Sequence, residues 1–227
     1  MQKKIAKLAA VKTLTTDTDT NTDIDTTSPD SQRKYSIIYA DPPWRYQDKA
    51  LDAGGAERHY STMPVRDICA LPVANLAADN AILFLWCTWP MYAEGLKVVE
   101  AWGFSLKTVA FVWMKTNKRA NPDQTSFFPS DNFDDFLGLG RWTRSNSEFC
   151  LLATKGRPKR ASTNVRQIIC APIGKHSAKP PETRDRIVKL AGNLPRVELF
   201  ARQATLGWDT WGNEIETDIV LSAQGVK

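Results

Sequence analysis

Six apolar runs along the chain have the length and residue types of buried strands. They are rich in β-branched and aromatic residues and are bounded by charged or turn-forming residues. The first two contain no alternation of polar and apolar positions, so both of their faces are expected to be buried, as in a parallel sheet. The runs are SIIYA (36–40), AILFLWC (81–87), TVAFVWM (108–114), EFCLLAT (148–154), VRQIICA (165–171) and RVELFA (196–201).

Three segments between these runs have the features of helices. Thr62 followed by Pro64 predicts an N-cap with proline just inside a short helix. Apolar residues recur at helical spacing over 90–102, and Gly103 follows as a stop signal. A third helix, opened by two prolines and ended by a glycine, is expected over 180–192. Strands alternating with helices predict an α/β fold with a mostly parallel, doubly wound sheet.

Two stretches depart from this pattern. Residues 13–31 are nearly all Thr and Asp and have no apolar periodicity, so residues 1–32 are interpreted as a flexible N-terminal tail. Residues 33–227 are then long enough for one domain. Residues 115–146 contain no clear element, and a loop of this length in a compact domain is typical of a functional lid or a disordered segment.

Composition narrows the class of protein. Hydrophobic residues make up 42% of the chain, enough for a substantial core. No apolar run approaches the ~18 residues of a membrane span, so no membrane association is expected. The four cysteines are widely spread without a Cys-x-x-Cys pair, and there are two histidines. We therefore expect no metal site, no disulfide framework and a cytoplasmic location.

Positive charge is concentrated in one part of the chain. Residues 141–189 contain twelve Lys or Arg and three acids, a net charge of +9, whereas the whole chain carries +5 and the remainder therefore −4. Such a segment favours a polyanionic partner, because phosphate contacts supply much of the affinity for nucleic acid. A solvated basic face is the alternative interpretation.

The sequence Asp41-Pro42-Pro43-Trp44 directly follows the first apolar run. Proline has no N–H, so this rigid turn presents mainly acceptor oxygens. Such a turn suits an exocyclic amine, which has two protons to donate, and the tryptophan offers a flat face to a purine. The acceptors bind more strongly as the amine becomes cationic in the transition state. The alternative is a turn that ends a strand, with Trp44 packed in the core.

Eight blocks in order resemble the adenine-N6 methyltransferases, the family that includes the catalytic subunit of the eukaryotic mRNA adenosine methylase and compact bacterial and phage DNA adenine methylases. The resemblance covers residues 35–215, nearly all of the expected domain. The blocks are ADPPW (40–44), HYSTM (59–63), ILFLW (82–86), VWMKTN (112–117), SEFCLLATKGRP (147–158), SAKPPE (177–182), VELFAR (197–202) and WGNE (211–214). The resemblance implies a single Rossmann-like, S-adenosylmethionine-dependent domain of permuted order, with the catalytic motif near the N-terminus.

The resemblance also implies roles for individual residues. It assigns the catalytic turn to Asp41, Pro42, Pro43 and Trp44, with the carboxylate and the Pro42 carbonyl receiving the amine protons. It assigns cofactor contacts to Asp41, Lys179, Arg202, Asn213 and Glu214. It assigns the acceptor pocket to Tyr60, Glu148 and Lys179.

The leading hypothesis is methyl transfer from S-adenosylmethionine to N6 of adenine in DNA, by a monomer or homodimer encoded by a bacterium or phage. The basic segment and the 115–146 loop would then bind the nucleic acid and enclose the base. RNA as acceptor, N4 of cytosine, a protein side-chain amide, and a non-catalytic nucleic-acid-binding subunit are the alternatives. No G-x-G-x-x-G follows a strand, which counts against a nicotinamide enzyme.

Overall fold

The computed structural model describes residues 33–46, 62–117, 136, 138, 142–174 and 178–221. The expected tail (1–32) and most of the long loop lie outside the described residues. The described elements are β1 (Tyr35–Ala40), α1 (Val65–Cys69), η3 (Val73–Asn75), β2 (Ala77–Cys87), η4 (Trp89–Met91), α2 (Tyr92–Ala101), β3 (Ser105–Thr116), β4 (Ser147–Lys155), β5 (Ile168–Pro172), α3 (Glu182–Ala191), β6 (Arg196–Leu199) and β7 (Asp209–Trp211).

The strands of the described part form one sheet in the order β5-β3-β4-β2-β1-β6-β7. The pairings β1–β2, β1–β6, β6–β7 and β3–β5 are parallel. Strand β4 runs antiparallel to both of its neighbours, β2 and β3. The mostly parallel α/β sheet predicted from the sequence is confirmed, and the fold is Rossmann-like.

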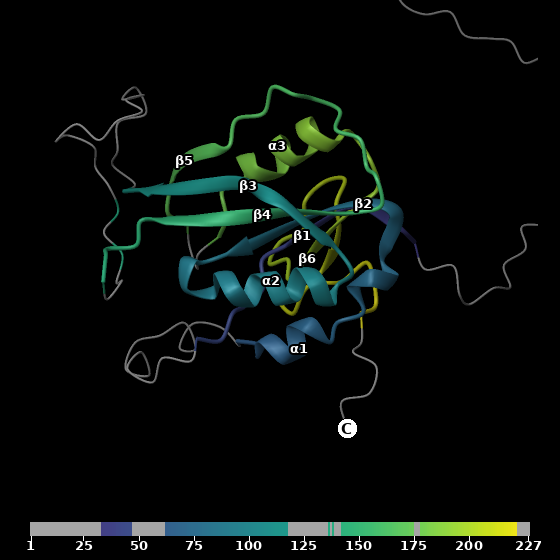
Figure 1. Cartoon of the computed structure of the whole chain (residues 1–227), viewed down its shortest axis with the longest axis horizontal. Helices are drawn as coiled ribbons and strands as arrows, with labels where there is room; N and C mark the ends of the chain where they lie inside the picture. Colours follow the sequence, from purple (N-terminus) through teal and green to yellow (C-terminus); the bar gives the residue numbers. More distant parts are fainter. Residues whose placement is uncertain are drawn as a thin grey trace, which may run out of the picture. The chain divides into compact units, whose positions relative to one another are not determined.

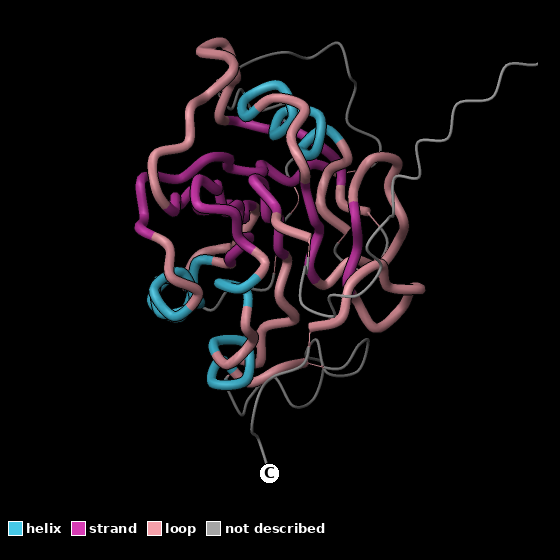
Figure 2. Tube along the Cα trace, turned by 90° about the vertical axis from the view of Figure 1, so that its right-hand side faces the viewer, coloured by secondary structure: helices cyan, strands magenta, loops and turns pink. Residues whose placement is uncertain are grey.

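Helices cover both faces of the sheet. Helix α3 lies on one face, and α1 and α2 lie on the other (Figures 1 and 2). The two layers of core follow from the strand period. In β1, Ile37 and Tyr39 point into the core beneath α3, whereas Ile38 and Ala40 point into the core beneath α1 and α2. Both faces of the central strands are therefore buried, which explains their unbroken apolar sequence.

A buried ion pair fixes α3 to the sheet. The Arg184 guanidinium donates to both carboxylate oxygens of Glu198 on β6, at 2.7 and 2.6 Å. The two side chains are 12% and 7% exposed, so each charge depends on the other for its solvation. The helix ends at Gly192, whose φ of 96° is strained for other residues, as the sequence predicted.

Two local predictions were wrong. Thr62 does not cap α1, because the N-cap position is occupied by Pro64 and no side chain makes a capping bond. The Thr62 hydroxyl instead accepts a hydrogen bond from Arg45 at 3.3 Å. The last predicted strand ends at Leu199 rather than at residue 201, because Phe200 turns the backbone into the left-handed region with φ of 61°.

Candidate active site

The fold brings several chain segments to one edge of the sheet. Strands β1, β2, β3, β6 and β7 run in the same direction, so their carboxyl ends lie at this edge. Strand β4 runs the other way, which puts its second residue, Glu148, at the same edge. Ligands of open α/β sheets bind beyond these carboxyl ends.

A cavity of about 180 Å³ opens at this edge. Six of the residues that the sequence assigned to catalysis, cofactor or acceptor line it: Asp41, Pro42, Trp44, Glu148, Lys179 and Arg202. Four further lining residues were missed: Tyr46, Trp86, Cys87 and Thr88. Trp86 and Cys87 end β2, Thr88 follows it, and Tyr46 lies just after the turn that follows β1, so a position at the carboxyl end of a strand or after the turn was the available signal.

The turn after β1 is held by hydrogen bonds on both sides. The Trp44 backbone N–H donates to the Pro42 carbonyl at 2.9 Å, and the Met63 N–H donates to the Pro43 carbonyl at 2.8 Å. The Trp44 indole N–H donates to the Trp86 carbonyl at 3.1 Å, and the ring is 5% exposed. The Pro42 carbonyl retains a second lone pair, and Pro42 lines the cavity, whereas Pro43 does not.

Four charged side chains of alternating sign cross the site. Lys179 Nζ lies 2.8 Å from each carboxylate oxygen of Asp41 and 3.2 Å from Glu148 Oε2. The other oxygen of Glu148, Oε1, accepts a hydrogen bond from Lys115 at 2.6 Å. Lys115, from the end of β3, was not assigned a role from the sequence, although it lies in the VWMKTN block. We refer to Lys115, Glu148, Lys179 and Asp41 as the charge network.

The charge network is largely shielded from water. The exposed fraction of the side chain is 9% for Lys179 and 8% for Glu148, against 24% for Asp41. Burial alone would lower the pKa of Lys179, but the carboxylates of Asp41 and Glu148 outweigh it and raise that pKa above 10.5. Burial alone would raise the pKa of Glu148, but Lys179 and Lys115 hold it below 4.5. Both groups are therefore charged at neutral pH.

Asp41 keeps the position that an acceptor of amine protons needs. It is paired with Lys179, yet it lines the cavity and is the most exposed member of its pair. Cys87 is the thiol at this cavity, and burial raises its pKa, so it is protonated at neutral pH and is no nucleophile. The arrangement therefore suits charge stabilisation and hydrogen bonding rather than covalent catalysis.

The turns after β6 and β7 approach each other closely. A Cβ placed on Gly212 would lie 2.0 Å from the backbone oxygen of Ala201, so only glycine fits between them. This contact brings Glu214, with its carboxylate 3.9 Å from the Arg202 guanidinium, toward the same edge. Arg202 lines the cavity, whereas Asn213 and Glu214 are exposed and do not line it.

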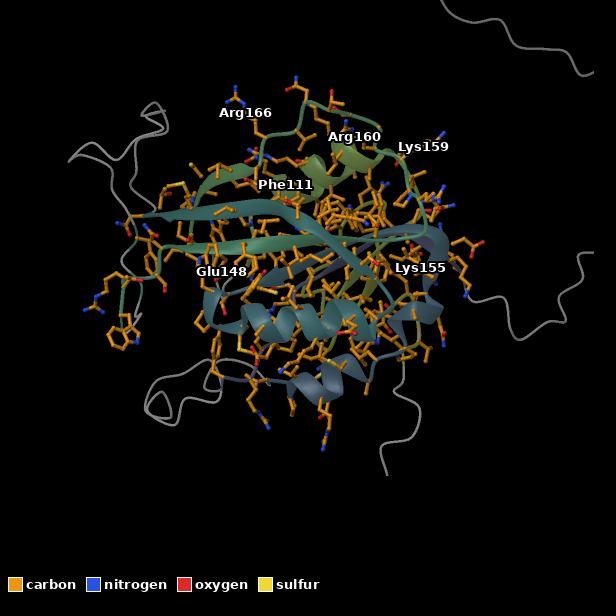
Figure 3. The ribbon with its side chains drawn as sticks, in the orientation of Figure 1. Phe111, Glu148, Lys155, Lys159, Arg160 and Arg166 are labelled. Carbon is orange, nitrogen blue, oxygen red and sulfur yellow. The ribbon has the colours of Figure 1, made fainter. Side chains whose placement is uncertain are left out.

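Two sequence-based assignments need comment. Tyr60 lies outside the described residues, so its role stays a prediction. Part of the basic segment, the basic run after β4 (residues 155–160), lies far from the cavity. Lys155 and Lys159 are at the opposite end of the sheet from Glu148 (Figure 3). At ~3.3 Å per strand residue, β4 separates Glu148 from Lys155 by about 23 Å. Nucleic-acid binding by this run stays a prediction, and its position means that it does not form the rim of the cavity.

In the described part of the chain, no His, Cys, Asp and Glu residues cluster in a way that would hold a metal ion. No helix among the described residues is long and apolar enough to cross a membrane.

Comparison with known proteins identifies relatives over most of the chain. The MT-A70 family matches residues 35–214. The chain is 36% identical over 214 residues to the type II methyltransferase M.MunI of Mycoplasma sp., covering 86% of this chain and 84% of that protein. It is 27% identical to a putative N(6)-adenosine-methyltransferase MT-A70-like of Medicago truncatula and 28% identical to the N(6)-adenine-specific methyltransferase METTL4 of Homo sapiens. These matches cover 86% and 81% of this chain, but 29% and 38% of the respective relatives.

Proposed function

Because the chain belongs to the MT-A70 family of adenine-N6 methyltransferases, we propose that it methylates the N6 amine of adenine in DNA. The similarity to a type II methyltransferase along most of both chains supports DNA as the acceptor. The observation that carries the proposal is that Asp41, Pro42 and Trp44 line one cavity at the carboxyl edge of the sheet.

The acceptor amine would bind at this corner through its two N–H groups. One would donate to Asp41 and the other to the Pro42 carbonyl, which draws the nitrogen lone pair out of conjugation with the ring. Lys179 contacts both oxygens of Asp41, and each of these oxygens keeps a second lone pair that can accept an amine N–H. Lys179 also contacts Glu148 at 3.2 Å, so its charge stays balanced while Asp41 binds the amine. The negative charge of Asp41 then stabilises the cationic nitrogen of the transition state.

The residues around the cavity fit S-adenosylmethionine as donor. When bound, this cofactor supplies a methyl group on a positively charged sulfur. Arg202 would hold the methionine carboxylate, and Asn213 and Glu214, carried toward the cavity edge by the Gly212 contact, would bind the ribose hydroxyls. With this cofactor bound, the amine nitrogen would attack its methyl carbon in line. The C–N bond would form as the C–S bond breaks, the electron pair would leave with sulfur, and Asp41 would pass an amine proton to water.

The same proposal covers the setting of the reaction. Residues 33–227 would act as one catalytic domain, as a monomer or homodimer, on DNA in a bacterial cytoplasm. The basic run after β4 would bind backbone phosphates away from the reacting base.

Product analysis tests the proposed function. The protein is incubated with methyl-labelled S-adenosylmethionine and either unmethylated DNA or RNA of mixed sequence, and the labelled nucleoside is identified by mass spectrometry. We expect N6-methyl-2′-deoxyadenosine. Label found in N4-methylcytosine, in RNA alone or in protein would contradict the proposal. An absence of label together with no thermal stabilisation by the cofactor would favour a non-catalytic binding subunit, since a bound ligand at 100 times its Kd adds about 2.7 kcal/mol.

A further inference from the structure

Two aromatic side chains beside the cavity are exposed. The exposed fraction is 50% for Trp89, on η4, and 45% for Tyr92, the first residue of α2. By contrast, Trp86 and Trp102 are fully buried. Two exposed aromatic rings beside a cavity form an apolar surface of the kind found in ligand-binding grooves.

The Trp89 ring is held in place rather than loose. Its indole N–H donates to the Ser147 hydroxyl at 3.0 Å. One part of the ring packs against Phe149, with the centroids 4.5 Å apart and the planes at 45°, and Phe149 itself is fully buried. Tyr92 contacts the same Phe149 at 5.9 Å. A ring fixed on one side and exposed on the other loses little entropy when a flat ligand covers it.

The position of Trp89 ties it to the cavity. It directly follows Thr88, which lines the cavity, and its two contacts, Ser147 and Phe149, flank Glu148, which also lines the cavity. Arg144 lies three residues before Ser147 and is exposed. Its short distance along the chain from Ser147 keeps this positive charge near the edge of the sheet where the cavity opens. Proteins that bind single-stranded nucleic acid stack its bases on aromatic side chains and bind its phosphates with nearby cations. Trp89 and Arg144 beside the cavity provide both kinds of group.

We propose that Trp89, assisted by Tyr92, stacks the nucleobase next to the adenine that is methylated. This inference rests on the proposed function and adds a binding subsite to it. Moving the target adenine out of its stack leaves its neighbour with one uncovered face. The exposed face of Trp89 replaces that lost contact. Stacking tolerates every base, so the subsite contributes affinity rather than sequence preference.

The test is a set of variants that separate the aromatic face from its supports. Trp89→Leu keeps an apolar contact with Phe149 but removes the face, Trp89→Phe keeps a face, and Ser147→Ala removes only the hydrogen bond to the indole. An oligonucleotide that carries 2-aminopurine beside a target adenine reports stacking by loss of its fluorescence, and titration gives the Kd without any methyl transfer.

We expect the bound 2-aminopurine to be quenched by the wild type and by Trp89→Phe, but not by Trp89→Leu. The oligonucleotide Kd should rise about tenfold in Trp89→Leu and stay within about threefold in the other two variants. The Kd for S-adenosylmethionine should be unchanged throughout.

Equal quenching and equal Kd in Trp89→Leu would overturn the inference, as would quenching absent from the wild type. A change of molecular mass in solution without a change in oligonucleotide Kd would assign the rings to a protein interface instead. Failure of the proposed function is seen separately, as an absence of methylated nucleoside. If Trp89→Leu does not fold, the 2-aminopurine signal of the wild type and Trp89→Phe decides.

Discussion

Replacing Glu148 with glutamine probes the charge network at its centre. The substitution keeps the size of the side chain and one acceptor oxygen but removes the negative charge. In the wild type two lysines and two carboxylates balance each other, with Glu148 bound to Lys115 at 2.6 Å and to Lys179 at 3.2 Å. In Glu148→Gln, Lys179 keeps its contact with Asp41, whereas the carboxylate that Lys115 contacts is replaced by a neutral amide.

The expected cost follows from burial. Removing one partner of a buried ion pair costs about 3–5 kcal/mol. We expect the lower end, about 3 kcal/mol, because Lys179 keeps Asp41 and the Lys115 side chain is 15% exposed. For a chain of this size that corresponds to a Tm lower by about 6–12 °C. Burial, rather than the short distance, is the reason for this magnitude.

The pH dependence has a defined sign. The folded-state pKa of Glu148 lies below 4.5, so the folded chain binds fewer protons at this site than the unfolded chain. The stabilisation is therefore complete well above pH 4.5 and is lost as the pH falls through the folded-state pKa. The Tm difference between wild type and Glu148→Gln should shrink over that range.

Calorimetry between pH 7.5 and pH 3.5 measures both effects, with Glu182→Gln as the matched control. Glu182 also has a 2.6 Å contact, to Arg186, but its side chain is 52% exposed. Exposed pairs contribute about 0–1 kcal/mol, so the control should lose about 4 °C or less. An equal loss in both variants, or a Tm difference for Glu148→Gln that is constant with pH, would refute the reasoning.

Three further predictions follow from other parts of the fold. Arg184→Leu should lower the free energy of unfolding, measured in urea, by about 3–5 kcal/mol, because it leaves the buried carboxylate of Glu198 without its ion-pair partner. The double variant with Glu198→Leu should regain most of this loss. A loss below about 1 kcal/mol in Arg184→Leu would contradict the prediction. Gly212→Ala should raise the calorimetric Kd for S-adenosylmethionine at least about tenfold, because the new Cβ displaces the backbone next to Asn213 and Glu214, which we propose bind the cofactor. An unchanged Kd would mean that these two residues do not bind it. Charge reversal in the basic run after β4 (Arg157→Glu, Lys159→Glu and Arg160→Glu) should weaken DNA binding and reduce the dependence of the Kd on salt concentration, as measured by fluorescence anisotropy. The single-turnover rate at saturating DNA should be unchanged. An unchanged salt dependence would mean that these residues do not contact DNA.

The sequence predicted the central strands well because their pattern is local. The six predicted runs became β1 to β6, with ends displaced by a few residues, although the fifth run contains Arg166 and Gln167 and the sixth contains Glu198. Strand β7 was missed because it contains three residues, Asp209–Trp211, of which two are polar, and it exists only through parallel pairing with β6. Short edge strands of this kind have no period of their own to detect.

The part of the site that was predicted is also the part whose pattern is local in the sequence. The turn after β1 follows a strand and carries its chemistry in four adjacent residues, so it was visible. Trp44 shows that the two interpretations of this turn were not exclusive, because the ring is both buried and part of the cavity wall. The charge network was not visible, because Asp41 and Lys179 are 138 positions apart and meet only when β1 and the segment before α3 reach one edge.

The most direct test of the account is the single-turnover rate of methyl transfer by Asp41→Ala at saturating DNA and S-adenosylmethionine. Lys179 keeps Glu148 as a partner in this variant, so the fold should persist, as circular dichroism and Tm would verify. Loss of the acceptor predicts a rate at least about 100-fold lower, the effect of removing one group that stabilises charge in a transition state. A folded Asp41→Ala protein that methylates adenine within a few-fold of the wild-type rate would contradict the account.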